Sequence, residues 1–158
     1  MIITIRKANS NDLEEILQLF RETIETVNAK DYSPEQIKVW KNGALKKERW
    51  LKKISEQCFL LAEIDNQLAG FGSITHDGHL DFMYVNKNNQ NIGVASKLYD
   101  SLEKFAKGTQ VNKIISDVSI TAKPFFEKQG FKLVQEQQVD IERIRLTNYK
   151  MEKHLGLR

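Results

Sequence analysis

The sequence is poor in cysteine, proline and histidine, with one, two and three of these among its 158 residues. A single cysteine cannot form an internal disulfide bond, which excludes a fold held together by such bonds. Cys58 lies in the apolar run CFLLAEI, which favours a buried strand thiol over a nucleophile. No Cys/His spacing typical of zinc ligands occurs, so we expect no metal site.

The sequence also lacks long apolar runs and dense blocks of one charge. No stretch approaches the roughly 20 apolar residues that a membrane span needs, and the first residues lack the basic flank and apolar run of a secretory signal. The net charge is +3, but lysine and glutamate alternate along the chain, whereas a nucleic-acid-binding surface concentrates its positive charge. These absences predict a cytoplasmic protein that binds neither membranes nor nucleic acids.

The residues that are present have the balance of a globular protein, with 41% apolar and 28% charged residues. No linker, internal repeat or low-complexity tract divides the chain. We therefore expect residues 1–158 to form a single domain.

Helical periodicity dominates the first third of the sequence. After a short β-rich run, Asn11 and Glu14 make a capping-box pattern that opens a long amphipathic helix. Ser33, followed by a proline and then by Gln36, is a second helix start. A third helix is predicted after Gly43, with four apolar residues at helical spacing: Leu45, Trp50, Leu51 and Ile54.

From residue 58 the pattern changes to strands. Strands are predicted at residues 58–64, 67–75, 79–85 and 111–118, with two more within 131–150. A helix that ends at Gly108 separates the third of these strands from the fourth, and a short helix at 122–129 follows. This order of elements predicts an α+β fold built on a mixed sheet.

The segment between the predicted strand at 79–85 and the next helix carries chemistry. The first amide groups of a helix have no partner within it, and its dipole places partial positive charge there, so such an end binds phosphate readily. Gly93 and Ala95 have little or no side chain, which lets a pyrophosphate approach the backbone closely. Taken alone, this pattern also fits a plain strand–helix loop with small packing residues.

Two motifs resemble the signatures of one superfamily. Gln90-Asn91-Ile92-Gly93-Val94-Ala95 resembles the Q/R-x-x-G-x-G/A acetyl-CoA motif of GNAT acetyltransferases. Residues 119–131, SITAKPFFEKQGF, are similar to its second signature, N/S-x-x-A-x-x-F/L-Y-x-x-x-G-F. The two motifs stand in the expected order, joined by a helix and a strand, and the resemblance covers nearly the whole chain. It implies a central mixed, mostly antiparallel sheet flanked by helices, with acetyl-CoA as cofactor.

The resemblance also implies a set of cofactor contacts. The main chain of Met83, Tyr84 and Val85 would bind the pantetheine arm and polarise the thioester carbonyl. The pyrophosphate would be held by a run of consecutive residues: Gln90, Asn91, Ile92, Gly93, Val94, Ala95 and Ser96. Ser119 would contact the pantetheine and Lys123 would lie near the nucleotide.

Acetyl transfer to an amine needs a base and a proton for the leaving thiolate. Counted back from Gln90, the position of the family's usual carboxylate base falls on His79, with Asp81 two residues further on. Either residue is a candidate base, and both also fit purely structural roles. Phe126, among the cofactor contacts, occupies the place of the usual general-acid tyrosine and cannot donate a proton. The thiolate could leave without enzymic protonation, or Ser119 or water could serve as the acid.

The acceptor side is less defined by the sequence. Tyr32, Trp40 and Trp50 belong to the helical block that lines the acceptor cleft in similar proteins, although the two tryptophans also fit a core. The resemblance predicts acetyl transfer to a primary amine of a small molecule or peptide, and a homodimer as a further expectation. An acyl-CoA-binding sensor with little turnover is the alternative, because of Phe126.

Overall fold

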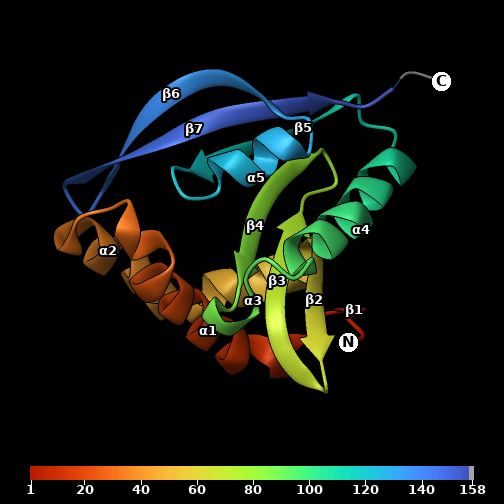
Figure 1. Ribbon diagram of the computed structural model, residues 1–158, viewed down its shortest axis with the longest axis horizontal. Helices are drawn as coiled ribbons and strands as arrows, with labels where there is room; N and C mark the ends of the chain where they lie inside the picture. The colour runs from red at the N-terminus through yellow and green to blue at the C-terminus, as the bar shows by residue number, and fades with distance from the viewer. Residues whose placement is uncertain (157–158) are drawn as a thin grey trace.

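The computed structural model describes residues 1–156, which form one seven-stranded sheet in the order β1-β2-β3-β4-β5-β7-β6 (Figure 1). All neighbouring strands pair antiparallel except β4 and β5, which are parallel. The strands are Thr4–Lys7 (β1), Cys58–Ile64 (β2), Gln67–Ile74 (β3), His79–Val85 (β4), Lys113–Ser119 (β5), Lys132–Ile141 (β6) and Ile144–His154 (β7). The predicted α+β fold on a mixed, mostly antiparallel sheet is confirmed.

Helices cover both faces of this sheet (Figure 1). Leu13–Thr26 (α1), Pro34–Lys41 (α2) and Lys47–Glu56 (α3) pack on one face, and Val94–Gly108 (α4) and Lys123–Lys128 (α5) on the other. On the first face Ile16 and Leu17 of α1 are fully buried against Phe59 and Phe71. No helix within residues 1–156 is long and apolar enough to cross a membrane.

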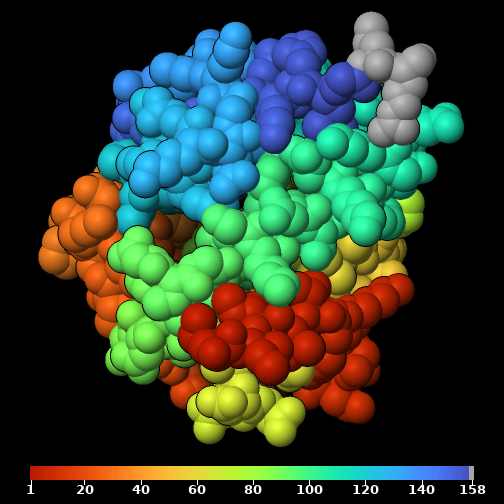
Figure 2. Space-filling model, turned by 45° about the vertical axis from the view of Figure 1, so that its right-hand side comes forward, coloured from red at the N-terminus to blue at the C-terminus, as the bar shows by residue number. Residues whose placement is uncertain are grey.

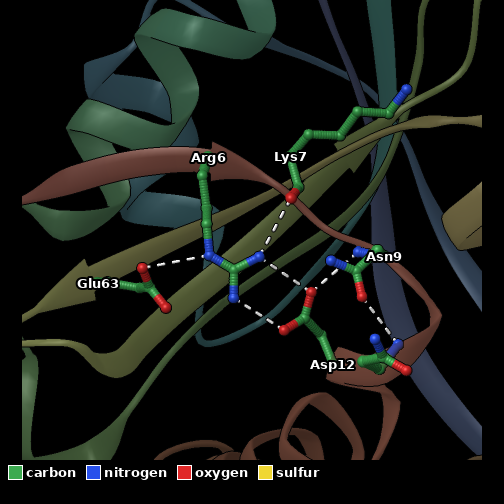
Figure 3. Close-up of polar contacts among 6 residues, drawn as sticks. Arg6, Lys7, Asn9, Asp12 and Glu63 are labelled. Atoms are coloured by element: carbon green, nitrogen blue, oxygen red, sulfur yellow. Dashed lines mark hydrogen bonds and ion pairs between the residues drawn. The ribbon is translucent and has the colours of Figure 1, made fainter.

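The start of α1 differs from the prediction. The capping box forms around Asn9, at the start of the 3-10 turn Ser10–Asp12 (η1) that leads into α1: the Asn9 side chain accepts from the Asn11 amide (2.9 Å), and the Asp12 carboxylate accepts from the Asn9 amide (2.9 Å). Arg6 fixes this arrangement, because its guanidinium contacts Asp12 (2.8 and 3.0 Å) and Glu63 (3.2 Å), as Figure 3 shows. Asn11 therefore lies inside the cap. The contacts of Arg6 with Asp12 and Glu63 join β1, β2 and the start of α1.

The third helix also starts later than predicted. Asn42–Leu45 forms a 3-10 turn (η3), and Leu45 is 75% exposed. The turn is held because the Trp50 indole donates to the Gly43 carbonyl (3.0 Å). The helix proper begins at Lys47. By contrast, the predicted capping box at Ser33 and Gln36 is confirmed at the start of α2.

Candidate functional site

The two parallel strands separate after only two paired positions. His79 pairs with Ile115 and Leu80 with Ser116, whose hydroxyl donates to the Leu80 carbonyl (2.8 Å). Beyond these residues β4 and β5 diverge (Figure 1). The register of β4 against β3 also shifts beside Asp81, between the pairs of Ile74 with Leu80 and of Ser73 with Phe82. The sheet is therefore split along most of β4.

Main-chain groups of β4 face this split. The Asn86 amide donates to the Ala69 carbonyl (2.8 Å), so the main-chain groups of Asn86 point toward β3. Successive residues of a strand point their main-chain groups to opposite sides, so the main-chain groups of Tyr84, two residues before Asn86, also point toward β3. The main-chain groups of Met83 and Val85 then point toward β5, into the split.

A cavity of about 630 Å³ occupies the split. Figure 2 shows a hollow bordered by α2 (orange), the loop after β4 (green) and the α5 region (light blue). Thirteen of the residues singled out in the sequence line the cavity: Trp40, Asp81, Met83, Tyr84, Val85, Gln90, Asn91, Gly93, Val94, Ala95, Ser96, Ser119 and Phe126. The structure thus brings most of the expected cofactor contacts together.

The N-terminus of α4 opens onto this cavity. Gly93 precedes the helix with a φ of 95°, and within residues 1–156 no side chain caps the first turn. A Cβ at Gly93 would meet nothing within 4 Å, so the space in front of the helix is open. The amides of the first turn therefore have no acceptor within the helix. The Gln90 side chain turns back and donates to the Val85 carbonyl (2.7 Å), which holds the loop.

A glycine in β3 lets α4 approach the sheet. A Cβ at Gly70 would lie 2.9 Å from the Tyr84 carbonyl oxygen and 3.0 Å from the Val94 Cγ1. Both distances are shorter than ordinary contacts, so a side chain here would push the start of α4 away from β3 and strain the pairing of β3 with β4. Gly70 thus sets the distance between the helix N-terminus and the split.

Asp81 lies in the cavity wall and is held by two residues from the end of α3. Lys53 Nζ (2.7 Å) and Gln57 Nε2 (2.8 Å) both donate to its Oδ2. Among the described residues Oδ1 accepts no hydrogen bond, which leaves it available to a ligand. His79, the other candidate base, does not line the cavity.

The second motif supplies the opposite wall. Ser119 Oγ accepts from the Ala122 amide (3.0 Å), so its own proton is free to point elsewhere. Phe126 is 3% exposed and packs edge-on against Phe131 at 5.0 Å between ring centroids.

Two of the expected cofactor contacts lie outside the cavity lining. Lys123 is ion-paired with Glu127 (3.1 Å). Ile92 is also outside the lining, and its side chain is 40% exposed.

The three aromatic residues expected on the acceptor side have different roles in the structure. Trp40 lines the cavity, next to Tyr84. Trp50 is 4% exposed, stacks on Phe82 at 4.5 Å and lies outside the cavity lining, which agrees with the alternative of a core residue. The Trp50 indole N–H donates to the Gly43 carbonyl in the turn before α3, which holds the ring in the core and away from the cavity.

Tyr32 joins two loops instead of lining the cavity. Its hydroxyl donates to the Thr147 carbonyl (2.7 Å) and accepts from the Ile120 amide (2.9 Å), next to Ser119. Burial raises the pKa of the phenol, so it remains a donor at neutral pH. Asp31 supports the same junction by accepting from the Thr121 hydroxyl (2.8 Å). Tyr32 thus lies outside the lining of the split-sheet cavity and positions the Ser119 loop.

We expect Tyr32→Phe to destabilise the protein by about 1–3 kcal/mol, because two part-buried main-chain groups lose their partner. Urea denaturation measures this change. Tyr149→Phe is the matched control, since within residues 1–156 its hydroxyl makes no hydrogen bond, and it should shift the free energy of unfolding by less than about 0.5 kcal/mol. Equal effects of both changes would contradict the role given to Tyr32.

Sequence reasoning also missed cavity residues from β5, from the α5 region and from the end of α1 with the turn after it. Thr23, Asn28 and Lys30 line the cavity, and the first two are only 4% and 6% exposed. Thr23, a polar residue on the otherwise apolar buried face of α1, was the available signal, whereas Asn28 lies in the turn after the helix. Burial also raises the pKa of the Tyr84 phenol, partly opposed by a hydrogen bond from Trp40, so Tyr84 stays protonated at neutral pH.

A sheet split between two parallel strands, with an open glycine turn at the helix beside the split, matches a known class of protein. The family model described as the acetyltransferase (GNAT) domain matches residues 28–153. The chain belongs to this family of acetyltransferases.

Individual relatives agree with this assignment. The uncharacterized N-acetyltransferase YafP of Escherichia coli (strain K12) is 33% identical over 150 residues, which cover 94% of each chain. The crystal structure of a GCN5-related N-acetyltransferase from Rhodopseudomonas palustris has a TM-score of 0.93 at 30% identity, covering 98% of this chain and 99% of that one. The PaiA N-acetyltransferase from Thermoplasma acidophilum, solved with coenzyme A, has a TM-score of 0.80 at 26% identity, covering 98% and 100%.

Proposed function

We propose that this chain, acting as a single domain, is an acetyl-CoA-dependent N-acetyltransferase that acetylates a primary amine by direct attack in a ternary complex. The observation that carries the proposal is the uncapped N-terminus of α4 beside the split between β4 and β5. The relative from Thermoplasma acidophilum that was solved with coenzyme A supports the choice of cosubstrate.

The residues present fit this ligand. The free amides around Gly93 suit a pyrophosphate, because they combine donors with the positive end of the helix dipole. The open space at Gly93 leaves room for the phosphate oxygens. Met83 and Val85 offer main-chain donors to an extended arm that lies in the split. In the same proposal Gln90 acts by holding the loop.

Acetyl-CoA would supply the acetyl group as a thioester, whose C–S bond breaks as the amine nitrogen bonds to the carbonyl carbon. The Met83 amide would stabilise the negative charge that develops on the carbonyl oxygen, an effect worth about 3–4 kcal/mol per donor. Asp81 Oδ1 is the base in this proposal, taking the proton of the amine directly or through one water. Lys53 and Gln57 orient the carboxylate through its other oxygen.

The departing thiolate has no tyrosine to protonate it at Phe126. A thiol pKa near 8.5 makes the thiolate a tolerable leaving group without an acid. Tyr84 is no substitute, because its raised pKa makes proton transfer to a thiolate unfavourable. Ser119, with a free hydroxyl proton in the cavity wall, can donate a hydrogen bond to the leaving sulfur.

Amine-dependent release of thiol from acetyl-CoA tests the proposal. We expect turnover with at least one primary amine, and mass spectrometry should find the product heavier by one acetyl group. Tight binding of acetyl-CoA without thiol release across a broad set of small-molecule and peptide amines would instead identify a sensor module.

A further inference from the structure

Asn28 is a largely buried residue whose side-chain polar atoms are open to the cavity, since the fully buried side-chain atoms without a partner among residues 1–156 are those of Gln57 and Ser73. Asn28 belongs to the turn Asn28–Lys30 (η2) after α1, is 6% exposed and lines the cavity. Within residues 1–156 no hydrogen bond joins its side-chain amide to another residue, although its main-chain carbonyl accepts from the Asp31 amide (3.0 Å). An amide that lines a cavity without a protein partner can hydrogen bond to a ligand that enters the cavity.

Asn28 lies on the side of the cavity away from α4. The cavity passes through the split sheet, with residues 93–96 of α4 on one side and Thr23, Asn28 and Trp40 from α1 and α2 on the other. The pyrophosphate belongs to the α4 side in the proposed function. The side that carries Asn28 is therefore open to the acceptor amine.

The chemistry of this side favours one kind of acceptor. The Asn28 amide offers both a donor and an acceptor, the pair that complements the N–H and C=O of another amide. Of the two carboxylates of the cavity wall, Asp81 is paired with Lys53 through Oδ2 (2.7 Å) and serves the reacting amine with Oδ1 in the proposed function, while exposed Asp117 accepts from Gln137 (3.0 Å). Lys30 and Lys128 add positive charge, which disfavours a polycation.

We propose that Asn28 determines acceptor specificity by hydrogen bonding to an amide group next to the reacting amine. The preferred acceptors are then amino-acid amides and peptide N-termini rather than simple alkylamines or polyamines. This inference rests on the proposed function, because it assigns the acceptor to the side of the cavity opposite the cosubstrate.

The test compares glycinamide with isobutylamine, which has the same branching but no amide, and with spermidine. Rates of thiol release are expressed per concentration of unprotonated amine. We expect kcat/KM of the unaltered protein to be at least about tenfold higher for glycinamide than for either other amine. Asn28→Leu, of similar size, should bring the ratio of glycinamide to isobutylamine to within about threefold of one, with the affinity for CoA unchanged.

Several results would overturn the inference. A ratio near one in the unaltered protein, or the same ratio in Asn28→Leu, would show that no specific contact exists. A tenfold weaker affinity for CoA in Asn28→Leu would assign Asn28 to the pantetheine arm. If the unaltered protein releases no thiol, the proposed function fails separately, and calorimetric binding of the two amines to the protein, with and without CoA, then decides whether Asn28 selects the amide.

Discussion

Gly93→Gln is expected to weaken the affinity for acetyl-CoA by at least about 100-fold. Gly93 has a φ of 95°, which any other residue adopts only at a cost of about 1–2 kcal/mol. A glutamine side chain would also enter the open space in front of α4, where the proposed pyrophosphate binds. Both effects act on the free amides of the first turn, and calorimetric titration measures the loss.

A matched control exists at the other end of the same helix. Gly108 is the last residue of α4, and a Cβ there also meets nothing within 4 Å. Gly108→Gln should leave the affinity for acetyl-CoA unchanged, and circular dichroism should show that both variants fold. If Gly93→Gln bound acetyl-CoA as tightly as the control does, the pyrophosphate would lie elsewhere.

Asp81→Asn is expected to lower kcat by about 100-fold to 1,000-fold, because general base catalysis contributes on this order. The asparagine keeps the size of the side chain but cannot accept the proton of the amine. The affinity for acetyl-CoA should stay within about threefold of the unaltered value, since the proposed cosubstrate contacts lie on β4 main chain and α4. Single-turnover kinetics separates this chemical defect from a defect in binding.

Asp65→Asn is the control for this change. Asp65 lies in the exposed turn between β2 and β3 with a φ of 52°, a conformation that asparagine also tolerates. The Asp65→Asn variant should retain full activity. A kcat of Asp81→Asn within about threefold of the control would show that His79 or water is the base, despite the position of His79 outside the cavity lining.

The sequence predicted most strands and helices because their patterns are local. The paired strands at residues 58–64 and 67–74 follow from their apolar runs and the turn between them. The start of α1 could not be predicted in the same way. Asn9 and Asn11 are equally good caps by residue type, and the choice depends on Arg6, which reaches Asp12 from β1.

The same distinction applies to the candidate site. The loop around Gly93 is contiguous, so its motif could be read directly and the structure lines the cavity with it. The partners of Asp81 come from α3, more than twenty positions earlier in the chain, and no spacing rule joins them. Trp50 could not be assigned either, because a tryptophan at helical spacing fits a core and a pocket equally well.

Calorimetric titration of the unaltered protein with acetyl-CoA tests the central claim most directly, with NAD and adenosine bisphosphate as controls. We expect binding of acetyl-CoA at micromolar concentrations with one site per chain, and much weaker binding of both controls. Absence of binding by acetyl-CoA, or equal binding of all three ligands, would contradict the assignment of the split sheet and the α4 N-terminus to this cosubstrate.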